Sequence, residues 1–137
     1  MGRMDFDDLQ GERSYSGARA YNQSKLANVM FTWSLANRLA GTGVMAVCVY
    51  PGLVATDLLR ERWWWRARWL RPLWRALFLS PNDAGRAVAD SATAPLAAEG
   101  DCLTLGGRPV RTPRAARDGA ARQRLWDASA RLVGVDL

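Results

Sequence analysis

The feature that most constrains the fold is a long helical segment followed at once by a short, continuous apolar run. Residues 18–40 read as a helix that stops at Gly41, a residue type that commonly ends helices. Residues 44–50 are apolar and rich in β-branched side chains, as expected for a strand buried on both faces of a parallel sheet. A helix leading directly into such a strand is half of a βαβ crossover. The sequence therefore predicts an α/β fold with a parallel sheet.

The other elements are predicted from capping residues, prolines and short apolar runs along the chain. Ser80 and Pro81 predict the N-cap and first position of a helix that continues to Pro95. Residues 100–107 predict a short strand and turn, and 118–132 predict a last helix with Leu125, Trp126 and Leu132 facing inward. Residues 1–17 and 111–117 are expected to be loops. At 137 residues, the chain is at most one domain, spanning 1–137.

The 18–40 helix carries apolar residues on two sides. On a helical wheel one side holds Leu26, Val29 and Trp33, and another holds Phe31, Leu35 and Leu39. A helix of this kind is packed on both sides. One side of the helix would pack against the sheet of the same chain. The other side would pack against a partner, and if that partner is a second copy of the chain, the protein is a homo-oligomer.

Tyr21 and Lys25 form the candidate catalytic pair. Residues four apart in a helix lie one above the other, so a phenol and an ammonium are presented side by side. A nearby cation favours phenolate and lowers a Tyr pKa toward the range useful for proton transfer. Lys25 is the only lysine among 19 basic residues, the rest being Arg. An ordinary surface pair is the alternative reading.

The predicted strand ends at Pro51 and Gly52. Ligands of open α/β sheets bind beyond the carboxyl ends of strands, and glycine lets a ligand approach the backbone. Thr56 or Asp57 would cap a following helix, whose free N–H groups suit a phosphate. A plain strand-to-helix turn is the alternative.

Composition excludes several classes of protein. The chain has no His, which removes Ser-His-Asp and Cys-His catalysis and argues against a zinc site, so no metal is expected. Cys48 and Cys102 read as small buried core residues and not as a disulfide or metal pair. No apolar run of transmembrane length and no signal peptide is recognised, so a cytoplasmic location is expected. The net charge of +6 comes with no nucleic-acid-binding signature, and no nucleic-acid partner is expected.

Residues 60–79 combine five Trp with six Arg, and Pro72 interrupts any helix there. Trp with Arg suits a membrane interface, which would make the protein peripherally membrane-associated. The same composition suits the wall of an apolar pocket. The composition of this segment does not distinguish between these two interpretations.

These motifs together resemble the short-chain dehydrogenase/reductase family, and specifically the C-terminal half of its retinol-dehydrogenase-like branch. The resemblance rests on the segments 5–9, 15–17, 21–28 and 51–56, supported by Ser80-Pro81 and Leu125-Trp126. It implies a partial Rossmann-like, doubly wound parallel sheet. It also implies an NAD(P)-dependent oxidoreductase that interconverts an apolar alcohol and its aldehyde or ketone.

The resemblance assigns roles to particular residues. Tyr21 would be the catalytic acid/base, and Lys25 would assist it and bind the nicotinamide ribose. Pro51, Gly52, Val54 and Thr56 would contact the cofactor, NAD or NADP. Residues 57–79 would be the variable substrate loop, whose Trp content suggests a bulky apolar alcohol, aldehyde or ketone as the small-molecule substrate.

The chain departs from the family pattern in one respect. The Gly-rich cofactor turn, the adenosine-side strand and the catalytic Ser of the family are not found in these 137 residues. We therefore expect a truncated chain or fragment. The alternative function is an inactive remnant acting as an interaction or membrane-surface module.

Overall fold

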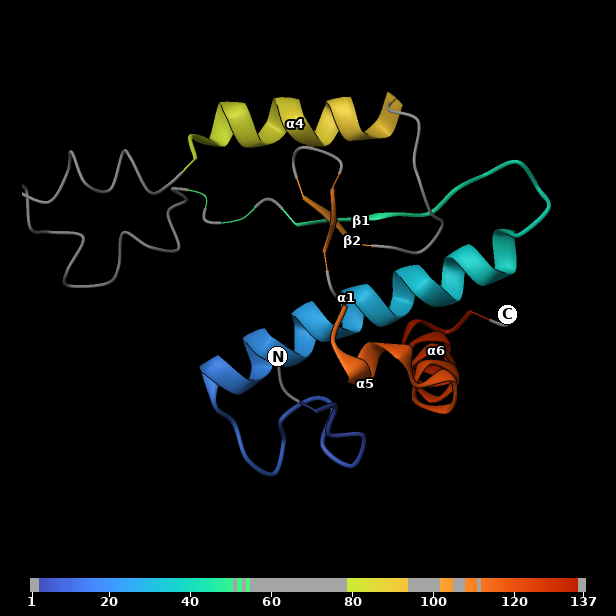
Figure 1. The fold of residues 1–137 in the computed structure, drawn as a ribbon. Coiled ribbons are helices and arrows are strands. Elements are labelled where there is room, and N and C mark those ends of the chain that lie inside the picture. The colour runs from blue at the N-terminus through green and yellow to red at the C-terminus, as the bar shows by residue number, and fades with distance from the viewer. Residues whose placement is uncertain are drawn as a thin grey trace, which may run out of the picture. The chain divides into compact units, whose positions relative to one another are not determined.

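The computed structural model describes residues 3–50, 52, 54, 79–93, 102–104, 108–110 and 112–135. Within these residues the order of elements is α1 (Gly17–Leu39), β1 (Cys48–Tyr50), α4 (Pro81–Thr93), β2 (Cys102–Thr104), β3 (Pro109–Val110), α5 (Arg114–Arg117) and α6 (Gly119–Val133) (Figure 1). The strands pair in the order β1-β2-β3. The predicted α/β class is confirmed.

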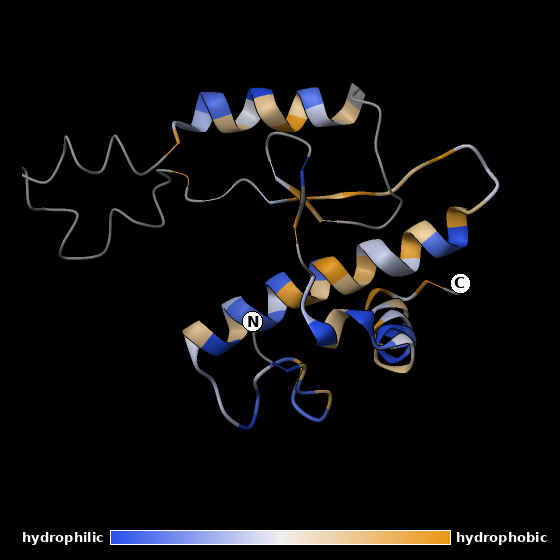
Figure 2. Ribbon diagram, in the orientation of Figure 1, coloured by the Kyte–Doolittle hydropathy of each residue, from blue (hydrophilic) through white to orange (hydrophobic). Residues whose placement is uncertain are grey.

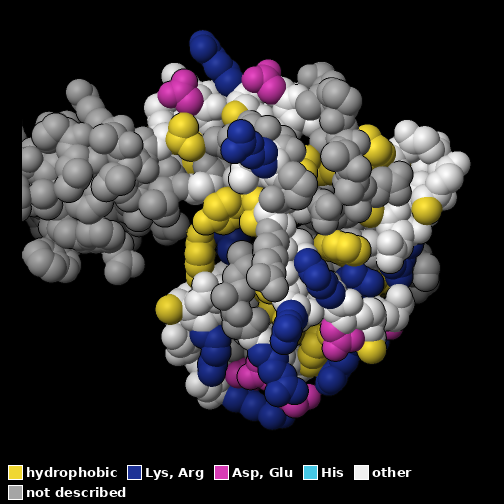
Figure 3. All heavy atoms as spheres, in the orientation of Figure 1, with side chains coloured by type: hydrophobic (Ala, Val, Ile, Leu, Met, Phe, Trp, Pro, Cys, Tyr) yellow, Lys and Arg dark blue, Asp and Glu magenta, His cyan; other side chains and the backbone are white. Residues whose placement is uncertain are grey.

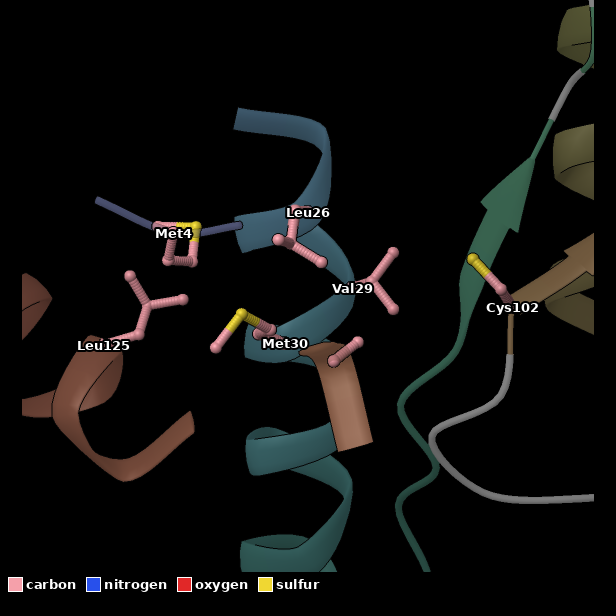
Figure 4. Close-up of a cluster of buried hydrophobic side chains, with 7 residues drawn as sticks. Met4, Leu26, Val29, Met30, Cys102 and Leu125 are labelled. Atoms are coloured by element: carbon pink, nitrogen blue, oxygen red, sulfur yellow. The ribbon is translucent and has the colours of Figure 1, made fainter. Parts of the chain in front are cut away.

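The chain divides into two compact units. The first comprises Met1–Cys48, Ala97–Cys102 and Val110–Leu137, and the second comprises Val49–Leu96 and Leu103–Pro109. In the first unit, α1, α5 and α6 pack on one another. The core of this unit is a cluster of Met4, Leu26, Val29, Met30, Cys102, Ala116 and Leu125 (Figure 4).

Helix α1 is packed on two sides, as its apolar pattern predicts. Leu26, Val29 and Met30 are almost completely buried. On the side of α6, the ring of Phe31 stacks on that of Trp126 with centroids 5.2 Å apart, and the Arg38 guanidinium lies 3.9 Å above the Trp126 ring. The α6 side of α1 is therefore covered from within the same chain. The colouring of α1 in Figure 2 shows apolar and polar residues interleaved along the helix.

The loop before α1 is held by hydrogen bonds. The Asp5 backbone N–H donates to Gln23 Oε1 at 2.6 Å, and the Asp8 carboxylate accepts from the N–H groups of Arg13 and Ser14. These backbone bonds, that from Arg13 foremost, hold the pKa of Asp8 below its usual value. Met4, within the same loop, enters the core.

Strand β1 is shorter than the sequence predicts. Residues 44–50 are expected to be a fully buried strand, but β1 begins at Cys48, and Val44 and Met45 are 55% and 46% exposed. The prediction was wrong because a continuous apolar run indicates cover on both faces of a sheet, and residues 44–47 lie outside the sheet. In the described part of the chain, β2 pairs with one edge of β1 and no strand pairs with the other.

The C-terminal helix begins as predicted. The Asp118 side chain caps α6 by accepting the Ala121 N–H at 3.1 Å. Leu125 and Trp126 are buried, but Leu132, expected to face inward, is 61% exposed. The Leu132 side chain borders an open hollow beside the 8–16 loop instead of the closed core. Residues 111–117, expected to be loop, contain the one-turn helix α5, and β3 was likewise not expected.

In the second unit, α4 starts where the sequence predicts. Ser80 Oγ accepts the Asp83 N–H at 3.1 Å and donates to the Asp83 carboxylate at 2.6 Å. This reciprocal pair satisfies free groups of the first helical turn. Val54 and Leu79 form a parallel β-bridge in the same unit.

Candidate active site

Tyr21 and Lys25 lie next to each other on the exposed side of α1. The Lys25 Nζ is 5.4 Å from the centroid of the Tyr21 ring, and the Tyr21 side chain is 51% exposed. The helical spacing of four residues produces this approach, as the sequence predicts. The pair therefore offers solvent a phenol hydroxyl with a cation against its ring.

Buried residues on the same turns of the helix fix the position of this pair. Leu26, immediately after Lys25, is completely buried, and Val29 and Met30 continue the buried side one turn later. Figure 4 shows Leu26 and Met30 with Met4 and Leu125 beside them, and Val29 directed toward Cys102. Because the core anchors α1 at this turn, the backbone that carries Tyr21 and Lys25 is held in place.

The polar residues next to the pair are bonded to their own helix. Ser24 Oγ donates to the Tyr21 carbonyl at 2.8 Å, and Thr32 Oγ1 donates to the Asn28 carbonyl at 2.9 Å. Asn28 itself is exposed on the same side as Tyr21 and Lys25. This polar, accessible stretch of α1 is the candidate site of the first unit.

Cys48 is the residue near this site that sequence reasoning missed. A hydrogen bond from Cys102, together with the charge of Lys25, lowers the pKa of the Cys48 thiol from 9.0 to about 7, although partial burial opposes the shift. The sequence reading assigned both cysteines to the core. That holds for Cys102, which is buried, whereas Cys48 is only half-buried. No sequence signal links the two cysteines, because pairing of β1 with β2 brings them together.

The predicted cofactor-binding residues after β1 are described in part. Gly52 belongs to the second unit and has a φ of 74°, a left-handed conformation in which a side chain would be strained. Val54 is half-buried and pairs with Leu79. Pro51 and Thr56 lie outside the described residues, as do 57–78, which contain nearly all of the expected substrate loop and membrane-contact segment. The roles of all these residues stay predictions.

Most of the arginines that the structure describes belong to the first unit. Arg38, Arg122 and Arg124 lie over the aromatic rings of Trp126, Trp33 and Phe6, with the Arg124 guanidinium also 3.3 Å from the Asp7 carboxylate. In the face shown in Figure 3, basic side chains alternate with acidic ones. Basic residues here cover aromatic rings and pair with a carboxylate. Among the described residues, no helix is long and apolar enough to cross a membrane.

Comparison with known proteins places this site in a family. Residues 9–67, which include every predicted site residue, match the family model described as short chain dehydrogenase. The chain is 39% identical to retinol dehydrogenase 12 of Homo sapiens over 145 residues, and 40% identical to dehydrogenase/reductase SDR family member 13 of Homo sapiens over 144 residues. The chain belongs to the short-chain dehydrogenase/reductase family.

Its relatives include several retinol dehydrogenases, in agreement with the branch predicted from the sequence. The match to human retinol dehydrogenase 12 covers 98% of this chain and 42% of that protein, and the match to family member 13 covers 37% of that protein. The chain thus spans less than half the length of these relatives. It also resembles the crystal structure of an uncharacterised protein from Mycobacterium paratuberculosis, with a TM-score of 0.69 and 26% identity over 98% of this chain and 46% of the other.

Proposed function

We propose that this chain carries the proton-transfer residues of an NAD(P)-dependent oxidoreductase, with Tyr21 as the acid/base and Lys25 as its partner. The observation that carries the proposal is the Tyr21–Lys25 pair on the exposed side of a helix whose other side is anchored in the core. Membership of an oxidoreductase family supports the same reading.

Lys25 and Gly52, each taken within its own unit, have the chemistry that a nicotinamide cofactor requires of the residues around it. Lys25 is exposed and offers three N–H donors, which suit ribose hydroxyl groups. Gly52 has no side chain, and among the described residues no atom is found within 4 Å of the position where a Cβ would stand. The Gly-rich turn that would hold the pyrophosphate is not found in the sequence. When bound, the nicotinamide would supply or accept the hydride.

In carbonyl reduction, the Tyr21 hydroxyl donates its proton to the substrate oxygen as negative charge develops there. In alcohol oxidation, Tyr21 accepts that proton. The Lys25 ammonium lies 5.4 Å from the centre of the Tyr21 ring, so a positive charge stands next to the group that exchanges the proton. The exposed position of Tyr21 gives a substrate direct access to the phenol.

We further propose that the substrate is an apolar alcohol or carbonyl compound. The names of the relatives, retinol dehydrogenases, support this class. The Trp-rich segment 60–79 would supply an apolar wall, and we propose it as the place of any peripheral membrane contact in a cytoplasmic protein.

The test uses protein expressed from the complete gene, with an apolar aldehyde and reduced NAD or NADP, followed by nicotinamide absorbance. Tyr21→Phe removes only the hydroxyl and should lower kcat by about 10²–10⁴-fold, the usual contribution of general acid–base catalysis. Tyr15→Phe is the matched control, since Tyr15 is also exposed but lies outside the Lys25 pair. Tyr15→Phe should leave kcat unchanged.

Turnover retained in Tyr21→Phe would overturn the assigned role. If the unmodified protein has no turnover with either cofactor, the oxidoreductase proposal fails and the non-catalytic remnant is favoured. Liposome co-sedimentation with and without residues 60–79 then tests the membrane-surface alternative.

A further inference from the structure

The two cysteines of the chain lie on neighbouring strands and face the same core. Cys48 is in β1, Cys102 is in β2, and these strands pair directly. Cys102 belongs to the core cluster around α1, and Cys48 packs against that cluster. The two side chains therefore lie on the same face of the sheet. The structure has no disulfide between them.

The distance between neighbouring strands suits a covalent bond between these residues. Paired strands lie about 4.8 Å apart, which falls within the Cα–Cα range of about 4.4–6.8 Å that disulfides span. The Cys102 thiol hydrogen-bonds to the Cys48 sulfur, so the two sulfur atoms already approach each other. A disulfide forms when the two sulfur atoms move from this hydrogen-bonding contact to bonding distance.

The surroundings make Cys48 the more reactive of the two. Cys48 is half-buried, whereas Cys102 is buried with 6% exposure. The hydrogen bond from Cys102 and the charge of the Lys25 ammonium both favour the Cys48 thiolate. Thiolates are the attacking species in exchange with disulfides.

We propose that Cys48 and Cys102 form a reversible redox pair, in which Cys48 is attacked from solvent by a low-molecular-weight disulfide and Cys102 resolves the adduct. This modification site lies beside Lys25 in the first unit. It does not depend on the proposed oxidoreductase function, because it requires only the two thiols and their neighbours.

The reaction balances as two successive exchanges. The Cys48 thiolate attacks one sulfur of the oxidised low-molecular-weight thiol, forming a mixed disulfide and releasing the other half as thiolate. The Cys102 sulfur then displaces the remaining half from Cys48, and the Cys102 proton leaves with the released thiol. The protein loses two hydrogens and two electrons, and the external disulfide becomes two thiols.

The expected rate follows from the pKa of Cys48. At about pH 7, a thiol with a pKa of 9.0 is roughly 1% thiolate, whereas a thiol with a pKa of about 7 is roughly half thiolate. A less basic thiolate is also a weaker nucleophile, by roughly tenfold over this range. The net expectation is attack about fivefold faster than by an ordinary thiol of the same accessibility.

The experiment treats the purified protein with oxidised glutathione under native conditions, quenches with acid and measures intact mass and tryptic peptides. The expected product lacks two hydrogens, carries no glutathione and gives a Cys48–Cys102 linked peptide that a reductant separates. In Cys102→Ala, glutathione should stay on Cys48. Lys25→Gln should slow the first attack, while Lys25→Arg, which keeps the charge, should not; circular dichroism verifies that each variant is folded.

A lasting glutathione adduct on Cys48 of the unsubstituted protein would overturn the proposal, since Cys102 would then not resolve it. So would the absence of reaction at Cys48, or disulfides formed only between two protein molecules. Equal rates for the protein and Lys25→Gln would refute the part assigned to Lys25.

Discussion

Replacing Leu26 by Ala tests whether the core behind α1 holds the candidate site in place. Leu26 is completely buried and follows Lys25 directly. Removing its buried methyl and methylene groups costs about 2.4 kcal/mol of transfer free energy, and an unfilled cavity raises the loss to about 5 kcal/mol in rigid cores. Two of the neighbours in the cluster, Met4 and Met30, are flexible side chains that partly fill a cavity. We therefore expect a loss of about 3 kcal/mol.

The assay is urea unfolding followed by far-ultraviolet circular dichroism. With a urea dependence of about 2 kcal/mol per molar, the midpoint of Leu26→Ala should fall by about 1.5 M. Leu132→Ala is the matched control, because Leu132 is 61% exposed, and its change should stay within about 0.5 kcal/mol. Equal midpoints for the two variants would refute the assignment of Leu26 to the core.

Two further predictions concern the cap of α6 and the charge state of Cys48. Asp118→Ala removes the side chain that accepts the Ala121 N–H and should lower the free energy of unfolding by about 1 kcal/mol. Asp118→Asn keeps an acceptor oxygen and should have a free energy of unfolding close to that of the unsubstituted protein. Equal free energies of unfolding for the Ala and Asn variants would contradict the capping role. The pKa of Cys48 is about 7 in the folded protein and 9.0 in the unfolded chain, so its stabilising contribution is complete above 9.0 and is lost as the pH falls through 7. As the pH rises from 7 to 9.0, the free energy of unfolding of the reduced protein should increase by about 1 kcal/mol relative to that of Cys48→Ala. This is less than the full linkage energy because the thiol is partly exposed to solvent. A difference between the two proteins that does not vary with pH would contradict this.

Local signals predicted the helices well. The cap residues Ser80 and Asp118 start α4 and α6 where expected, because their side-chain bonds depend only on residues three positions ahead. The proximity of Tyr21 and Lys25 likewise follows from helical spacing. The predicted catalytic and cofactor-binding roles stay predictions.

Long-range pairing was not predictable in the same way. The apolar run 44–50 looked like a complete buried strand, yet only Cys48–Tyr50 forms β1, since strand length depends on the neighbours that pair with it. Leu132 has the same apolar character as Leu125, and their difference in exposure depends on what covers each turn of α6.

The sequence by itself therefore determined the class of fold, the helix that carries Tyr21 and Lys25, and the family, because these depend on local periodicity, capping and motif spacing. Only the tertiary structure brought Cys48 and Cys102 onto paired strands beside Lys25. It also covered one side of α1 with α6. Both outcomes depend on contacts between residues far apart in the chain, which no local pattern encodes.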